Sequence, residues 1–206
     1  PTGSGKSNLA VNLAKILDTE IVYADSLAIY KELNIGTAKP TKSEIESVKH
    51  HLVDVCSPTD NFSVSDYETL ALSAVQSILD KNKPAIICGG TGFYINSLLY
   101  KMSYGNTAKN LEVRNKYMEL AKTDGVDAVY NELLKVDEET AKKLHKNDLV
   151  RVVRALEIYY STGKKKSLQN DKEEPRFSYL AYSIDMPRDV LYSRINLRVE
   201  KMFEEG

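Results

Sequence analysis

The first seven residues, Pro1-Thr2-Gly3-Ser4-Gly5-Lys6-Ser7, are the most informative stretch for predicting the fold. It fits the last seven positions of the phosphate-loop pattern G-x-x-x-x-G-K-[ST]. In such a loop, glycines let backbone N–H groups point into one concavity, and the N-terminus of the following helix adds positive potential. The lysine neutralises phosphate charge, and the serine hydroxyl holds Mg²⁺. We therefore expect a phosphate site here rather than a chance glycine turn.

Working outward from the loop, the residue pattern predicts alternating helices and strands. A helix is expected at Ser7–Leu17, and short β-branched or aromatic runs predict strands at Glu20–Asp25, His51–Val55 and Ala85–Cys88. The apolar positions of the first helix are Leu9, Leu13, Ile16 and Leu17. A capping box at Ser65–Glu68 would open an amphipathic helix before the third strand. Strand, helix and strand in this order predict parallel βαβ units.

The second half of the chain changes character. From about residue 105 to Ser167 the pattern is helical, with predicted helices at Leu111–Ala121, Ala128–Val136 and Leu149–Tyr160, the last closed by Gly163. A polar, linker-like stretch follows at Asn170–Pro175. The final predictions are a strand at Ser178–Asp185 and a helix at Arg188–Phe203.

These patterns predict an α/β fold with a phosphate-loop NTPase-like parallel sheet flanked by helices and an all-helical insertion. The sheet domain is expected to comprise residues 1–104 and 176–206, and the insertion residues 105–175. A strand normally precedes a phosphate loop. We therefore expect the 206 residues to be a piece of a longer chain.

Composition excludes several classes of protein. With 42% hydrophobic and 28% charged residues, ten glycines and six prolines, the chain is neither collagen-like nor disordered. It has no apolar run long enough for a membrane span and no secretory leader, so we expect a cytoplasmic protein. The two cysteines, Cys56 and Cys88, are far apart in the sequence, which disfavours a disulfide framework or a zinc site.

Charge is balanced overall but not locally. The net charge of −1 argues against a protein that coats nucleic acid nonspecifically. The segment Ala141–Lys166 nevertheless carries eight basic and two acidic residues. It could meet a polyanion, or it could be an ordinary solvated helical face.

Polar or glycine residues stand at the ends of the predicted strands. Asp25 ends the first, Asp54 nearly ends the second, and Gly89-Gly90-Thr91-Gly92 follows the third. Ligands of open parallel sheets bind beyond the carboxyl ends of the strands. Each residue could separately be a turn or cap, but together, beside a phosphate loop, they favour a site.

Several motifs resemble those of one family, the tRNA dimethylallyltransferases, over nearly the whole chain. They are the phosphate loop, Ala24-Asp25-Ser26, Tyr30, Ile35-Gly36-Thr37-Ala38-Lys39-Pro40, His50-His51-Leu52-Val53-Asp54, Gly89-Gly90-Thr91-Gly92-Phe93-Tyr94 and Arg154-Ala155-Leu156-Glu157. The resemblance implies a prenyl transferase of the shorter, bacterial type that modifies the adenosine after the anticodon. Many members carry Gln where this chain has Ala28.

The resemblance also implies residue roles. Asp25 would be the general base and Arg198 a second catalytic residue, with Mg²⁺ at Ser7. The implied contacts to the diphosphate of dimethylallyl diphosphate are Thr2, Gly3, Ser4, Gly5, Lys6, Ser7 and Arg198. The implied contacts to the anticodon stem-loop of tRNA are Asp25, Ser26, Leu27, Ala28, Thr91, Arg114, Val150, Arg151, Val152, Val153 and Arg154. We expect a monomer that binds no membrane.

The chemistry of the residues agrees with these roles. An exocyclic adenine amine is a poor nucleophile that a nearby carboxylate assists, and a departing diphosphate needs cations to absorb its charge. Arg194 and Arg198 lie four residues apart on one predicted helical face, which could also be an ordinary exposed face.

Three alternatives stay open from the sequence. The first is a small-molecule kinase in which Asp25 or Asp54 holds Mg²⁺. The second is an adenylate isopentenyltransferase, and the third a non-catalytic nucleotide-binding domain.

Overall fold

The computed structural model describes residues 2–104, 110–169 and 175–204. The chain divides into two compact units. We call Pro1–Lys101 with Glu174–Gly206 the sheet unit, and Met102–Glu173 the helical unit. Most of the predicted linker, residues 170–174, lies outside the described residues.

The sheet unit contains the predicted parallel sheet. Among the described residues its strands are β1 (Ile21–Tyr23), β2 (His50–His51) and β3 (Ile86–Cys88), in the order β2-β1-β3. Both neighbours pair with β1 in parallel, with Ile21 opposite His50 and Ile86. The carboxyl ends of the strands therefore meet at one edge, as the sequence predicted.

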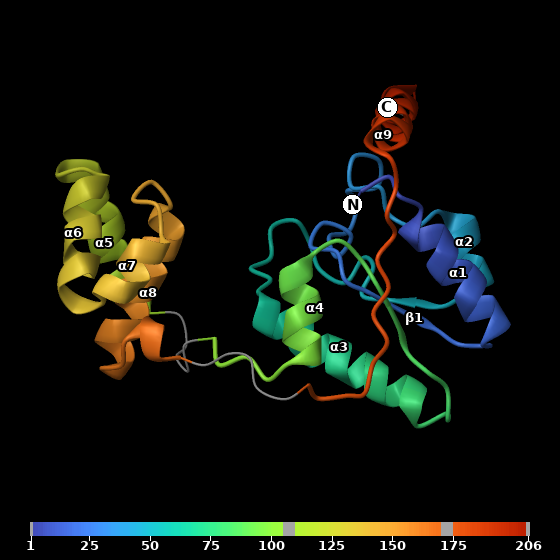
Figure 1. The fold of residues 1–206 in the computed structure, drawn as a ribbon, viewed down its shortest axis with the longest axis horizontal. Helices are drawn as coiled ribbons and strands as arrows, with labels where there is room; N and C mark the ends of the chain where they lie inside the picture. The colour runs from blue at the N-terminus through green and yellow to red at the C-terminus, as the bar shows by residue number, and fades with distance from the viewer. Residues whose placement is uncertain (1, 105–109, 170–174, 205–206) are drawn as a thin grey trace. The chain divides into compact units, whose positions relative to one another are not determined.

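Helices lie on both sides of β1 (Figure 1), and alternating β1 side chains belong to two different core clusters. Ile21 and Tyr23 pack with α1 (Lys6–Ile16) and, through Val48, beside α2 (Lys42–Ser47). Val22 packs with α3 (Val64–Leu79) and α4 (Gly92–Leu99) in the other cluster. This arrangement confirms the predicted α/β fold, because a strand covered on both faces is apolar throughout.

Two helices differ in detail from the predictions. The α1 side chains that pack on the sheet are Ala10, Val11 and Ala14. The predicted apolar positions Leu9, Leu13, Ile16 and Leu17 are exposed instead. Helical periodicity identifies an apolar stripe, but small side chains can bring a neighbouring stripe closer to the strands.

The capping box of α3 also lies elsewhere. Ser63 caps the helix, with its hydroxyl accepting from the Asp66 N–H and the Asp66 carboxylate accepting from the Ser63 N–H at 2.8 Å. The prediction of a box at Ser65–Glu68 was wrong. The Glu68 carboxylate instead forms an ion pair with Arg176, so it does not reach back to the helix start.

Two strand predictions need correction. The predicted strand His51–Val55 is shorter, because Leu52 and Asp54 have φ angles of 63° and 57°, which end the extended conformation. The predicted strand Ser178–Asp185 is not formed in the described structure, and Leu180 and Tyr182 there are more than four-fifths exposed. A β-prone run without a neighbouring ladder remains an irregular extended segment.

The helical unit is a small bundle around its own core. Its helices are α5 (Leu111–Thr123), α6 (Val126–Val136), α7 (Glu138–Lys143), α8 (Leu149–Thr162) and the 3₁₀ turn η1 (Lys166–Leu168). The core residues include Tyr117, Val129, Leu133 and Leu156. Gly163, with φ 68°, closes α8 as predicted. Strand is absent from the described part of this unit.

The chain returns to the sheet unit and ends its described part in α9 (Arg188–Glu204), which lies near the N-terminus (Figure 1). Over the residues that the structure describes, every helix is too short or too polar to traverse a lipid bilayer.

Candidate active site

The phosphate loop has the backbone that anion binding requires. Gly3 and Gly5 have φ angles of 74° and 90°, which only glycine adopts readily. Gly5 is the N-cap of α1 and, being a glycine, makes no side-chain cap hydrogen bond to the helix. The start of α1 therefore presents the backbone N–H groups of its first turn to the loop, in the positive field of the helix dipole.

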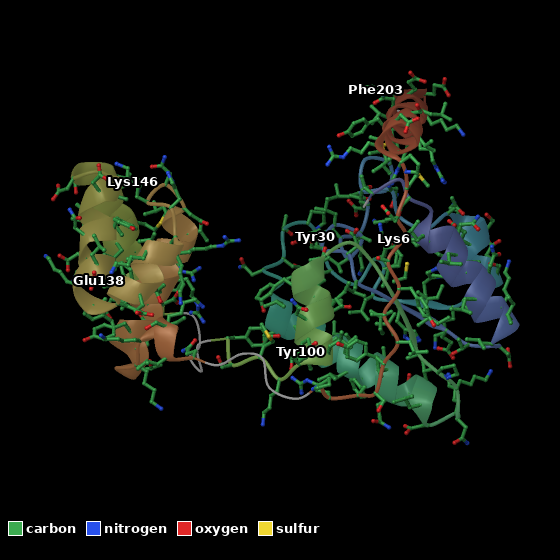
Figure 2. The ribbon with its side chains drawn as sticks, viewed as in Figure 1. Lys6, Tyr30, Tyr100, Glu138, Lys146 and Phe203 are labelled. Atoms are coloured by element: carbon green, nitrogen blue, oxygen red, sulfur yellow. The ribbon has the colours of Figure 1, made fainter. Side chains whose placement is uncertain are left out.

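Helix α9 packs against this loop and brings two guanidinium groups to it. A Cβ on Gly3 would lie 3.0 Å from the Ile195 Cγ1 atom, and one on Gly5 would lie 3.4 Å from Arg194 Nη2. Arg198 Nη1 donates to Thr2 Oγ1 at 3.2 Å. Figure 2 shows Lys6 in the same unit, on the side nearer to α9. The predicted Arg198 thus reaches the loop, and so does Arg194, whose spacing of four residues was the signal.

The side chain of Ser7 contacts Tyr23, a residue of β1 that was not among the predicted site residues. Its hydroxyl lies 3.1 Å from the Tyr23 hydroxyl. Burial raises the pKa of Tyr23, so this phenol stays a neutral hydrogen-bonding group. Tyr23 stands two residues before Asp25 in the strand motif, which is the only sequence signal for it.

The donor set around the loop fits a magnesium ion that is shared with substrate phosphates. Such an ion takes one or two protein oxygens and completes its shell with phosphate oxygens and water. The Ser7 hydroxyl supplies one such oxygen. Clusters of three or more His, Cys, Asp or Glu side chains suited to a metal are absent from the described residues.

Asp25 stands at the carboxyl end of β1, where the sequence placed it. Its Oδ1 atom accepts hydrogen bonds from the N–H groups of Leu27 at 2.9 Å and Ala28 at 3.4 Å. Its Oδ2 atom lies 4.0 Å from where a Cβ on Gly90 would be, and accepts no hydrogen bond in the described structure. One oxygen therefore shapes the turn and the other is uncommitted.

The backbones that follow β1 and β3 approach each other closely at Ala24 and Gly89, next to Asp25. A Cβ on Gly89 would lie 2.0 Å from the Ala24 carbonyl oxygen, so only glycine fits there. The same carbonyl accepts from the Thr91 N–H at 3.1 Å, and the Ser26 N–H donates to Thr91 Oγ1 at 2.9 Å. The glycine-rich motif thus fixes Thr91 against the turn that carries Asp25.

Lys6 of the phosphate loop and Asp25 at the end of β1 both lie close enough to Cys88 to influence its pKa. Burial raises the pKa of the Cys88 thiol, and the nearby Lys6 charge lowers it while Asp25 raises it. The structure therefore brings Lys6 and Asp25 within electrostatic range of the same buried thiol. Cys56 and Cys88 are both free.

The predicted tRNA contacts of the helical unit have unequal exposure. Val150 and Arg151 are about three-quarters exposed. Val152 and Val153 are buried in the helical core, so their side chains are not accessible. In the sheet unit the side chain of Ala28 is buried, whereas Leu27 is half exposed.

Two of the predicted tRNA-binding arginines are bound to a buried carboxylate. Glu157 is fully buried, and its Oε2 atom lies 2.7 Å from Arg114 Nη2 and 3.0 Å from Arg154 Nη1. Its Oε1 atom accepts from the Asn110 N–H at 2.6 Å. Burial raises the pKa of Glu157, but these hydrogen bonds outweigh it and lower the pKa overall. The charge of Glu157 thus ties α5 to α8.

The fold and the loop together define a class, the phosphate-loop α/β proteins with a strand-end carboxylate. The sequence model described as IPP transferase matches residues 28–206. The chain is 43% identical to the tRNA dimethylallyltransferase of Acetivibrio thermocellus and 42% identical to that of Bacillus cytotoxicus. It is covered entirely in both comparisons and spans 67% and 66% of those proteins. The chain belongs to the IPP transferase family.

Solved structures agree with this assignment. The full-length tRNA isopentenylpyrophosphate transferase of Bacillus halodurans is similar with a TM-score of 0.60 and 36% identity. A eukaryotic dimethylallyltransferase acting on tRNA is similar with a TM-score of 0.84 and 31% identity. All of this chain is covered in each case, against 64% and 52% of those chains.

Proposed function

We propose that the protein containing this chain is a tRNA prenyltransferase. It moves a dimethylallyl group from dimethylallyl diphosphate to N6 of the adenosine that follows the anticodon, and it releases diphosphate. Membership of the IPP transferase family supports the reaction, since the similar proteins are named for it. The reaction takes place in the cytoplasm, on the anticodon stem-loop.

The observation that supports this proposal most directly is the split use of the Asp25 carboxylate. Oδ1 is fixed by two backbone N–H groups, so the orientation of the carboxyl group is set. Oδ2 is left to accept a proton from the N6 amine as the new N–C bond forms and the C–O bond to diphosphate breaks. A fixed base with an uncommitted oxygen is what general base catalysis needs.

The phosphate loop and α9 receive the leaving group in this proposal. Backbone N–H groups at the start of α1, together with Lys6, bind the diphosphate, and Arg194 and Arg198 approach the loop from α9. Bound Mg²⁺ would supply further charge neutralisation at the Ser7 hydroxyl. Donors aimed at the oxygens where negative charge develops stabilise the transition state.

One experiment tests the reaction and the nucleic-acid substrate together. The full-length protein is incubated with Mg²⁺, dimethylallyl diphosphate and an anticodon stem-loop that carries the adenosine, and the RNA is analysed by mass. A gain of one dimethylallyl group on that adenosine is expected. Prenylation of free AMP alone would indicate an adenylate isopentenyltransferase, and phosphate transfer from ATP would indicate a kinase; either would contradict the proposal.

A further inference from the structure

The motif Ile35–Pro40 contains a buried lysine whose partners show what the motif does. The Lys39 side chain is only 5% exposed. Its ammonium group donates to the Tyr30 carbonyl, to Asn34 Oδ1 at 3.1 Å and to Asp54 Oδ1 at 2.6 Å. An ammonium group has three protons, so these three acceptors satisfy it completely. Burial of a charged group at this depth is favourable only with such partners.

Asp54 connects this lysine to the turn that carries Asp25. The Asp54 N–H donates to the Ala28 carbonyl at 3.1 Å, and the Ala28 N–H donates in turn to Asp25 Oδ1. The next residue continues the contact, with the Val55 N–H donating to the Ile29 carbonyl at 2.8 Å. A continuous series of hydrogen bonds therefore joins Lys39, through Asp54 and Ala28, to the carboxylate of Asp25.

The backbone on both sides of this ion pair is unusual. Ala38, just before Lys39, has a φ of 50°, and Asp54 itself has a φ of 57°. Residues other than glycine are uncommon in this left-handed region and need surrounding structure to hold them there. The ion pair connects Asp54 to Lys39, the residue that follows Ala38. The Lys39 ammonium group also binds the carbonyl of Tyr30, the last residue of the turn that carries Asp25.

We propose that Lys39 and Asp54 form a positioning pair that fixes the turn of residues 25–30 and so aims Oδ2 of Asp25 at the nucleoside. Asp54 then acts as the fixed partner of a lysine and not as a metal ligand. The pair reaches Asp25 through Ala28, so it is expected to act on the base and to leave diphosphate binding unchanged. This inference rests on the proposed function for the role of Asp25, but the hydrogen bonds that it describes do not.

Hydrogen exchange tests the structural part in the full-length protein. Lys39→Met removes the ammonium group and keeps an apolar stem of similar length. Amide exchange of residues 25–31 and 53–56 should rise by about tenfold or more, since the buried Lys39 side chain loses its charge-assisted hydrogen bond to Asp54, whose own side chain is 44% exposed. Lys83→Met is the matched control, because Lys83 pairs with the exposed Asp18 in the same unit. It should leave exchange in these segments unchanged.

Prenylation kinetics test the functional part. Lys39→Met should lower single-turnover prenylation of the stem-loop by about tenfold to a hundredfold, while the affinity for a non-reactive diphosphate analogue stays unchanged. Lys39→Arg keeps the charge and should recover part of the rate. If Lys39→Met does not fold, Asp54→Asn serves instead, because it keeps the shape of the side chain and removes its charge.

The outcomes separate the two proposals. Unchanged exchange in the turn would overturn the positioning pair, and so would faster exchange with a wild-type prenylation rate. A parallel loss of diphosphate affinity would also contradict it, since the pair would then act on the loop. A wild-type protein that does not prenylate RNA would refute the proposed function, whereas the exchange result would still decide whether the pair holds the turn.

Discussion

Arginines in the two units of this chain have different surroundings. In the sheet unit, Arg194 and Arg198 approach the phosphate loop, and neither forms an ion pair with a carboxylate in the described part of the chain. In the helical unit, Arg114 and Arg154 bind the buried Glu157, and Arg151 pairs with Asp148. The first pair is available to an anionic ligand, whereas the second set already neutralises carboxylates.

This difference shows how little a count of basic residues says about binding. The segment Ala141–Lys166 is the most basic stretch singled out in the sequence, yet Lys142, Lys146, Arg151 and Arg154 all make ion pairs within the unit. Exposed pairs of this kind contribute little to stability and can exchange partners, but a buried pair holds its helices together. Arg154 is thus tied to the buried Glu157, whereas Arg151 makes only an exposed ion pair with Asp148.

The largest expected effect tests whether the sheet unit carries the chemistry. Asp25→Asn should keep both substrates bound and lower single-turnover prenylation by about two to four orders of magnitude, because the amide cannot accept the proton. The matched control is Asp60→Asn, since Asp60 also accepts a turn N–H, from Ser57, but lies away from the loop in sequence. A near wild-type rate for Asp25→Asn would leave Asp25 as a turn residue only.

The next effect concerns the stability of the helical unit. Glu157→Ala leaves Arg114 and Arg154 without their shared carboxylate and should lower the free energy of unfolding of this unit by about 3 to 5 kcal/mol. Hydrogen exchange resolved by segment measures it, and the sheet unit should be unaffected. Glu132→Ala, which removes only the i,i+3 pair with Lys135, is the control. Equal losses in the two variants would show that burial of Glu157 does not matter.

A smaller effect appears in the pH dependence of the sheet unit. Hydrogen bonding to Lys81 and His51 outweighs burial and lowers the pKa of Glu20 to about 2. Because the folded pKa is below the unfolded value, this stabilisation is complete above about pH 4.5 and is lost as the pH falls toward 2. Glu20→Gln should flatten acid unfolding over this range, by about 2 kcal/mol or less since Lys49 and Lys81 are well exposed.

For this measurement, denaturant unfolding at several pH values is compared between wild type and Glu20→Gln. The control is Glu46→Gln, which makes the same change of charge on the exposed surface of α2. Acid curves of the same steepness in wild type and Glu20→Gln would contradict the lowered pKa.

The smallest expected effect distinguishes the two arginines of α8. Arg151 is 74% exposed in its side chain, so Arg151→Ala should weaken stem-loop binding by about threefold to tenfold without loss of stability. The slope of log affinity against log salt should fall by about one unit for a lost phosphate contact. Lys135→Ala is the control within the helical unit. An unchanged salt dependence in Arg151→Ala would show that Arg151 serves only Asp148.

Arg154→Ala extends this comparison. Because Arg154 is bound to the buried Glu157, its loss should reduce the stability of the helical unit together with any loss of RNA affinity. A variant that loses stability and keeps its affinity for the stem-loop would assign Arg154 to the fold alone.

Much of the sheet unit could be predicted because its signals are local. The loop glycines, a helix that begins directly after them and the apolar strands follow from motif and backbone preference; the helix was expected from Ser7 and begins at Lys6. The placement of Asp25 at a strand end followed from the same pattern, and the parallel sheet then put it beside Gly90. The IPP transferase family was recognised from motifs in the order in which the fold uses them.

The predictions failed where a distant partner decides the outcome. Glu68 could cap α3 by its spacing, but Arg176, far along the chain, binds it instead. Ser178–Asp185 has the composition of a strand, but a strand also needs a neighbour to bond. Periodicity likewise could not tell which side of α1 meets the sheet.

Local patterns in the sequence are enough to predict the phosphate loop, the parallel direction of the strands and an aspartate, Asp25, at the end of the first strand, because each follows from one short segment or from the succession of strand, helix and strand. Which charges a ligand can reach follows only from the folded structure. Lys39 is paired with Asp54, Arg154 with Glu157, and Arg194 with no carboxylate in the described residues. The physical reason is that the cost of burying a charge is offset only by a partner at hydrogen-bonding distance, and folding alone brings such partners together.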